Sequence, residues 1–146
     1  MLLLAGELLG GGMQHRALTG TTLLAPARPT VLPVVCVEAG RWHGQVRHRR
    51  QARRAPFAVL PRADRSDVQN KVWRRVRRYE AVAGPPATES LVERLDRAES
   101  TARDLVRDLR PLAGQRGLLV GIAGWPAWLE LFDSERALRV HWPGLL

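Results

Sequence analysis

The chain has 146 residues, of which 45% are hydrophobic, and a formal net charge of +9. This length suffices for one domain with a substantial core and leaves no comfortable room for two domains. The excess charge is local: residues 41–79 hold 13 Lys and Arg against two Asp (net +11), and the rest of the chain holds 10 basic and 12 acidic residues (net −2).

Neither cysteine content nor hydropathy predicts an exported or membrane protein. Cys36 is the one cysteine, and a lone cysteine cannot form an internal disulfide. The apolar amino terminus is short, no basic residue precedes it, and Glu7 interrupts it, unlike a signal peptide. The longest uncharged apolar stretch, 117–129, is too short to span a bilayer as a helix. We expect a cytoplasmic bacterial protein.

The first forty residues predict strands and turns. Leu2–Leu4 is a short apolar run, which Gly10–Gly12 ends with a tight bend. Residues 21–25 and 30–38 are rich in β-branched side chains, as strands are. Pro33 predicts an edge strand, a bulge or a bend in the second of these. The stretch that follows, 43–65, is polar and arginine-rich with two prolines, and it predicts a long, mobile loop.

Two helices are predicted next. Ser66 and Gln69 fit a capping box, and apolar residues at helical spacing follow until 84–86, Gly-Pro-Pro, stops the helix. Residues 88–110 predict a second helix, which 99–101 could divide because Ser and Thr favour caps.

The carboxyl-terminal part predicts a hairpin and a last helix. Runs at 118–122 and 127–132 read as strands joined by 124–126, and Asp133 is placed to cap a helix over 134–142. Strands, helices, a hairpin and a helix in this order indicate an α+β fold, with a mostly antiparallel sheet and three to four helices.

Several familiar sites are excluded by their missing motifs. The glycines at 10–12 lack both the Walker lysine and the GxGxxG spacing, so neither a P-loop nor a Rossmann fingerprint is present. One cysteine and four scattered histidines offer no zinc-ligand spacing, and no GxSxG elbow exists. We therefore predict no metal and no cofactor.

The segment 11–16, Gly-Gly-Met-Gln-His-Arg, is the first candidate for binding. Gly11 and Gly12 let the backbone approach a ligand closely and can aim amide groups at an anion, and Gln14 and Arg16 would add donors. From composition alone, a flexible turn with solvated polar side chains is the commoner arrangement.

The segment 35–42 is the second candidate. A strand delivers Glu38 to its end, and Arg41 and Trp42 could then offer a charge and a stacking face. Cys36 alternates with valines, which favours a small buried side chain. As a nucleophile, Cys36 would need His15 or His43 nearby as a base. Gln115, in a loop before a strand, is either a turn residue or a polar lining of a cleft.

The basic segment 41–78 has two interpretations. Arginine binds phosphate bidentately and stacks on aromatic rings, so the segment could contact nucleic acid. A solvated basic face is the commoner case and is the favoured interpretation.

Together these segments resemble those of the ARG and Rhodanese-Phosphatase-superfamily-associated protein domain family. The most specific block is 33–42, which is similar to the family's Pro-Val-Ser-Cys-Val-Glu-x-Gly-Arg-Trp. Glu7 followed by 11–16 resembles Gly-Glu-Glu-Leu and then Gly-x-Lys-Gln-Asn-Arg, with Met13 and His15 replacing the family's Lys and Asn. Weaker blocks follow in the same order: Gln69 with Trp73, 114–117, and 129–132 through 142–143.

The resemblance also bears on completeness and function. Met1 falls where the family's sheet is already under way, so the resemblance implies an N-terminally incomplete domain, either a shortened form or a start codon placed too late. The family's association with ADP-ribosylglycohydrolases and rhodanese-phosphatases implies the handling of an NAD-derived nucleotide such as ADP-ribose, with no defined reaction.

The resulting hypothesis gives each candidate residue a role. Gln14, Arg16 and the glycine backbone would hold phosphate, Glu38 would be an acid/base or a ribose-binding carboxylate, Arg41 a second phosphate contact, and Trp42 a stacking platform. The alternatives are a non-catalytic nucleic-acid-binding module that uses 41–78, and a truncated, inactive relative.

Overall fold

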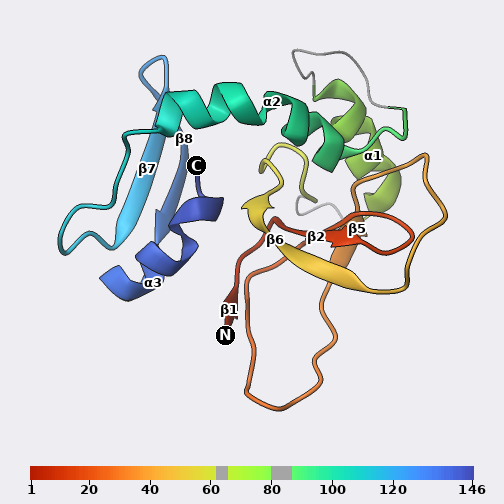
Figure 1. Cartoon of the computed structure of the whole chain (residues 1–146), viewed down its shortest axis with the longest axis horizontal. Coiled ribbons are helices and arrows are strands. Elements are labelled where there is room, and N and C mark those ends of the chain that lie inside the picture. Colours follow the sequence, from red (N-terminus) through yellow and green to blue (C-terminus); the bar gives the residue numbers. More distant parts are fainter. Residues whose placement is uncertain (62–65, 80–86) are drawn as a thin grey trace.

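The computed structural model describes residues 1–61, 66–79 and 87–146. A four-stranded sheet and helix α1 (Val68–Arg78) lie on the right in Figure 1, and a two-stranded hairpin with helix α3 (Glu135–His141) lies on the left. Helix α2 (Leu91–Val106) runs between these two parts. The three helices and antiparallel sheets confirm the predicted α+β class.

The larger sheet is antiparallel throughout and has the strand order β5-β3-β2-β6. Its strands are β2 (Glu7–Gly11), β3 (Arg16–Leu18), β5 (Val34–Cys36) and β6 (His48–Arg54). Pro33 immediately precedes β5, which is an edge strand, as predicted for a strand beside proline. A separate pair joins β1 (Leu2–Leu3) to β4 (Thr22–Leu23).

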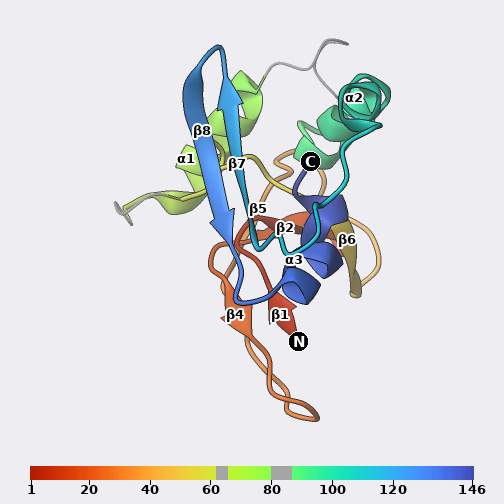
Figure 2. The ribbon, with the colours of Figure 1, turned by 90° about the vertical axis from the view of Figure 1, so that its left-hand side faces the viewer.

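The predicted carboxyl-terminal hairpin is confirmed with shifted bounds. Strand β7 (Gly117–Ile122) pairs with β8 (Trp125–Leu131), so the turn consists of Ala123 and Gly124, both with positive φ. A short 3-10 helix, η1 (Trp142–Gly144), follows α3. In Figure 2 the hairpin lies in front of the rest of the chain.

The prediction of a loop over 43–65 is wrong for 48–54, which form strand β6 along β2. The arginines that made this stretch look like a loop are paired. Arg50 binds Glu7, Arg53 binds carboxylates of α2, and Arg54 binds Glu130 of the hairpin. These partners lie 43 to 76 residues away in the sequence, so no local pattern could predict the strand. Residues 62–65 lie outside the described residues.

The glycines at 10–12 also differ from their prediction. Strand β2 continues to Gly11, so the bend comes later than expected. The register of β2 with β6 shifts between Glu7 and Leu9. Strand β3 was not predicted either, because three residues are too few to show alternation.

Neither of the two predicted helix caps forms. Asp67 precedes α1 in a left-handed conformation (φ 47°) without capping it through its side chain, so the Ser66–Gln69 capping box does not form. Ser134, rather than Asp133, caps α3 by accepting a hydrogen bond from the Ala137 amide at 3.2 Å. The predicted stop at 84–86 lies outside the described residues.

Helix α2 is not divided at 99–101. It begins after Ser90, whose hydroxyl accepts a hydrogen bond from the amide of Glu93, and it continues without a break to Val106. None of the helices in the described ranges is long and apolar enough to cross a membrane.

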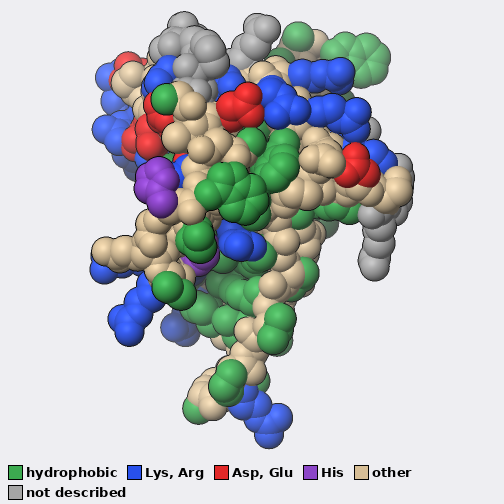
Figure 3. Space-filling model, turned by 90° about the vertical axis from the view of Figure 1, so that its right-hand side faces the viewer, with side chains coloured by type: hydrophobic (Ala, Val, Ile, Leu, Met, Phe, Trp, Pro, Cys, Tyr) green, Lys and Arg blue, Asp and Glu red, His purple; other side chains and the backbone are tan. Residues whose placement is uncertain are grey.

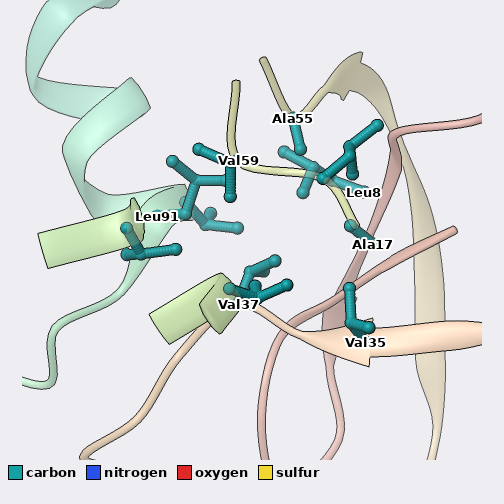
Figure 4. Close-up of a cluster of buried hydrophobic side chains, with 11 residues drawn as sticks. Leu8, Ala17, Val35, Val37, Ala55, Val59 and Leu91 are labelled. Atoms are coloured by element: carbon teal, nitrogen blue, oxygen red, sulfur yellow. The ribbon is translucent and has the colours of Figure 1, made fainter. Parts of the chain in front are cut away.

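The main core joins the larger sheet to the start of α2 and to the buried face of α1. Figure 4 shows Leu8 of β2, Val37 just after β5 and Leu91 of α2, each with 0% exposure, pointing into the cluster. A smaller cluster consists of Leu4, Leu138 and Leu145, and Leu118 of β7 and Phe132 after β8 pack against it. The larger core holds β2, β3 and β5 against both helices and so fixes the loops between them.

Gln69 binds the open edge of the larger sheet. Its side chain accepts a hydrogen bond from the Cys36 amide at 3.0 Å and donates one to the Cys36 carbonyl at 2.7 Å. An edge strand leaves such backbone groups without a strand partner. The side chain of Gln69 therefore takes the place of a neighbouring strand.

We expect Gln69→Leu to lower the free energy of unfolding by about 2 kcal/mol, because a backbone donor and a backbone acceptor lose their partners. Denaturant unfolding would measure the change. Asn70→Leu, one position along the same helix, is the control, because among the described residues the Asn70 side chain bonds to the exposed Asp67 and not to the sheet. Equal costs for the two variants would contradict the assignment of Gln69 to the sheet edge.

Candidate functional site

Three segments meet at one end of the larger sheet: residues 12–15 between β2 and β3, 38–43 after β5, and 88–90 before α2. Backbone hydrogen bonds join these segments. The Val37 amide donates to the His15 carbonyl and the Leu91 amide to the Val37 carbonyl, both at 2.9 Å, and the Gly40 amide donates to the Thr88 carbonyl at 2.9 Å. The loop after β5 lies at the right-hand end of the molecule in Figure 1.

Glu38 lies at the centre of this junction and is only 2% exposed. Its Oε2 accepts hydrogen bonds from the His15 amide and from Arg41 Nε, both at 3.0 Å, and its Oε1 accepts one from Thr88 Oγ1 at 2.9 Å. Arg41 Nη2 also lies 2.8 Å from Oε2. We refer to Gln14, His15, Glu38, Arg41 and Thr88 as the Glu38 cluster.

The pKa of Glu38 is lower than the usual value. Burial alone would raise this pKa, but hydrogen bonds from Arg41, the His15 amide and Thr88 outweigh burial and lower it. Glu38 is therefore ionised at neutral pH, and its charge is compensated by Arg41. This arrangement suits a carboxylate that orients its neighbours.

Gln14 and Arg41 bind other parts of the chain. Gln14 is 2% exposed and donates from Nε2 to the Glu38 carbonyl at 2.9 Å. Arg41 Nη1 donates to the carbonyls of Gly12 at 3.0 Å and His43 at 2.9 Å. Of the predicted phosphate donors, Gln14 thus donates one side-chain hydrogen bond within the protein and Arg41 donates three.

His15 is the most open titratable group of the cluster, with 22% of its side chain exposed. Its Nδ1 lies 3.3 Å from Ser90 Oγ and 3.8 Å from Glu38 Oε2. Burial lowers the pKa of His15, although Glu38 acts in the opposite direction. The ring is therefore neutral at pH 7 and can accept a proton or a hydrogen bond. From the sequence, His15 was considered only as a possible base for Cys36, and it was not predicted to be a binding residue.

Trp42 projects from the same loop and is 62% exposed. It packs edge to face against Trp73 of α1, with the ring centroids 6.4 Å apart and the planes at 84°. Figure 3 views the molecule from this end and shows apolar side chains in the middle of the face and Lys and Arg side chains along its upper part.

The glycines before the cluster are needed for contacts within the protein. Gly11 and Gly12 have φ of +89° and +64°. A Cβ on Gly12 would lie 2.1 Å from His48 Nε2, and one on Gly11 would lie 2.9 Å from the Arg47 carbonyl oxygen. These glycines therefore allow the backbone to lie close to the start of β6, at Arg47 and His48.

The remaining predicted residues lie around or away from the cluster. Arg16 is half-buried on β3, opposite Cys36. Cys36 is itself half-buried, and its thiol makes no hydrogen bond to His15 or to any other described residue. Gln115 lies in a different part of the chain, where it bonds to the Leu112 amide and the Gly117 carbonyl, as a turn residue does.

No group of three His, Cys, Asp or Glu side chains in the described ranges could hold a metal ion. Two hollows run along β6, and the residues of the Glu38 cluster line neither of them. What the cluster offers chemically is a neutral imidazole beside a fixed carboxylate–guanidinium pair, with an exposed indole next to it.

The fold and the junction define an α+β domain in which three loops meet on the buried carboxylate of Glu38. The model of the ARG and Rhodanese-Phosphatase-superfamily-associated Protein domain matches residues 1–146, the whole chain. The chain belongs to this family, as its resemblance predicted. No curated protein and no solved structure matches it.

Proposed function

We propose that this domain binds or processes an NAD-derived nucleotide, such as ADP-ribose, over the Glu38 cluster. The observation that carries the proposal is the exposed Trp42, which directly follows Arg41 of the Glu38 cluster and packs on Trp73. Exposed aromatic rings next to positive charge are a common way to bind a nucleotide base and its phosphates. The edge contact with Trp73 restricts the orientation of Trp42 before any ligand binds.

Within this proposal Trp42, Arg16 and Arg41 keep the roles expected from the sequence, and the roles of His15, Glu38 and Gln14 change. Trp42 stacks on the base, and Arg16 and Arg41 provide positive charge for the phosphates. His15 accepts a hydrogen bond from a ribose hydroxyl, or its proton where the nucleotide is processed. Glu38 and Gln14, both 2% exposed, position these groups without touching the ligand.

A nucleic-acid-binding role for the segment 41–78 has less support. Arg50, Arg53 and Arg54 make ion pairs with carboxylates. Arg75 donates to the Leu60 carbonyl, and Arg77 pairs with Glu89. These contacts leave fewer arginines free for a phosphate backbone, whose binding needs many cations at once.

Thermal unfolding with ADP-ribose, NAD and AMP tests the proposal. A ligand at about 100 times its Kd should stabilise the native state by about 2.7 kcal/mol. We expect Trp42→Ala to weaken binding by about tenfold or more, because base stacking on an aromatic ring contributes about 1–3 kcal/mol. Trp125→Ala is the matched control, because Trp125 is 78% exposed on the distant hairpin.

No stabilisation of the wild-type protein by any of the three nucleotides would reject the proposal, and equal weakening in both tryptophan variants would reject the site. Salt-dependent gel shifts with DNA and RNA test the alternative. Binding that appears at low salt and falls steeply as salt rises would favour the nucleic-acid role.

A further inference from the structure

A second group of buried polar side chains lies away from the Glu38 cluster. A cavity of about 250 Å³ lies between β2, β6 and the end of α3, and its lining includes Glu7, Arg50 and His141. The side chain of Glu7 is 4% exposed, that of His141 is 6% exposed, and that of Arg50 is 41% exposed. Arg50 therefore lies at the boundary between the cavity and solvent.

Glu7 has its hydrogen bonds supplied from within the chain. Arg50 donates to both carboxylate oxygens, with Nη2 2.8 Å from Oε1, and the Leu4 amide donates to Oε1 at 2.9 Å. The negative charge of Glu7 is thus balanced by Arg50. Arg50 uses Nε and Nη2 for this pair, and its Nη1 makes no hydrogen bond to a described residue.

His141 differs from Glu7, because its ring makes no hydrogen bond to any described residue. Its Nδ1 lies 3.7 Å from Glu7 Oε1, which is beyond hydrogen-bond distance. The ring stacks on Phe132, with centroids 5.6 Å apart and planes at 12°, and this contact fixes its orientation. No ring nitrogen of His141 is among the fully buried polar atoms without a partner in the described residues, so these nitrogens reach the cavity, where a ligand can bond to them.

Charged side chains of both signs surround the His141 ring. Glu7 on β2, Arg50 and Arg54 on β6, and Glu130 on β8 face the ring, two anions against two cations. Burial lowers the pKa of His141, so the ring is neutral at pH 7. A bound anion would favour the protonated ring, and it could also accept a hydrogen bond from Arg50 Nη1.

We propose that this cavity binds a small oxyanion, the carboxylate or phosphate group of a small molecule, between Arg50 and His141. Arg50 Nη1 and an imidazole N–H of His141 can each donate a hydrogen bond to an oxygen of such a group, while Nε and Nη2 of Arg50 stay on Glu7. Binding is coupled to protonation of His141, so the anion raises the pKa of His141 and binds more tightly as pH falls. The site is separate from the Glu38 cluster and does not depend on its function.

NMR titration of the four histidine rings tests this site. Sodium phosphate and sodium acetate are added in separate series at constant ionic strength, with sodium chloride as the reference, and the His141 signals are assigned from their loss in His141→Phe. We expect a saturable shift of the His141 signals in one or both series and a raised His141 pKa at saturation. The series that saturates at the lower concentration identifies phosphate or carboxylate as the preferred group.

Two variants separate binding from folding. His141→Phe keeps an aromatic ring on Phe132, so we expect it to fold, to bind the anion about tenfold more weakly and to lose most of the thermal stabilisation by the anion. Arg50→Lys keeps the positive charge beside Glu7 but removes the planar fork, and it should also weaken binding. Equal shifts of all four histidines, no saturable shift of His141, or wild-type anion binding by His141→Phe would overturn the proposal.

Discussion

Replacement of Glu38 by glutamine should lower the free energy of unfolding by about 3–5 kcal/mol at pH 7, since removal of one partner of a buried ion pair strands the other charge. The Arg41 side chain is only 18% exposed, so little water can reach its guanidinium to replace the lost carboxylate. The amide of glutamine also adds donors where the His15 amide and Arg41 already donate. Urea unfolding at constant ionic strength measures the cost.

The cost should depend on pH in one direction. The pKa of Glu38 is lowered in the folded state, so the folded protein binds fewer protons than the unfolded chain below the ordinary value of 4.5. The stabilisation from Glu38 is therefore fully present above about pH 4.5 and is lost as pH falls through the folded-state pKa. The difference between wild type and Glu38→Gln should narrow over the same range.

Glu93→Gln is the matched control for Glu38→Gln. Glu93 also pairs with an arginine, Arg97, but its side chain is 40% exposed, and such pairs contribute at most about 1 kcal/mol. If both variants cost the same, or if the cost of Glu38→Gln stays constant down to pH 3, Glu38 is not the ionised centre of the junction.

The location of the candidate site was predicted well from the sequence, and the roles of its residues were predicted less well. Segments 11–16 and 35–42 meet because β3 pairs with β5, and the strand signal in 30–38 was sufficient to place Glu38 at a strand end. Burial was not predictable. Glu38 and Gln14 look like surface residues in a polar loop, and only the approach of Thr88 and Ser90 from the start of α2 encloses them.

No comparable strand signal marks the polar residues of β6 in the sequence. Alternation of apolar and polar side chains is the usual signal for a strand, and His48–Arg54 has none. The strand forms because its arginines meet carboxylates on β2, α2 and β8. Gln69 failed as a predicted cap for a related reason, because its partner is the backbone of Cys36, 33 residues away. His141 likewise lies far in sequence from Glu7 and Arg50.

Gly44 is a further residue whose role depends on distant contacts. Its φ is +143°, and a Cβ added to it would lie 2.4 Å from the Gly12 carbonyl oxygen and 2.8 Å from Arg41 Nη1. The same carbonyl accepts a hydrogen bond from Arg41 Nη1. Gly44 therefore allows the loop after β5 to close on the turn between β2 and β3, which is the contact that assembles the Glu38 cluster.

We expect Gly44→Ala to lower the free energy of unfolding by about 2–4 kcal/mol, from overpacking of about 1–3 kcal/mol and about 1 kcal/mol for a positive φ. Backbone on both sides of the contact has to move, so the hydrogen bond from Arg41 to the Gly12 carbonyl should be lost. Thermal and urea unfolding measure the stability. The amide signals of residues 12–15 and 38–43 should shift together in NMR spectra.

Gly114→Ala separates the two contributions. Gly114 also has a positive φ, +73°, but a Cβ there would meet no atom within 4 Å. Its substitution should therefore cost only the backbone strain, about 1 kcal/mol, and leave the signals of the Glu38 cluster in place. The excess cost of Gly44→Ala over Gly114→Ala then measures the closure of the two loops. An excess near zero would mean that the loops can separate without loss, and that the Glu38 cluster does not depend on Gly44.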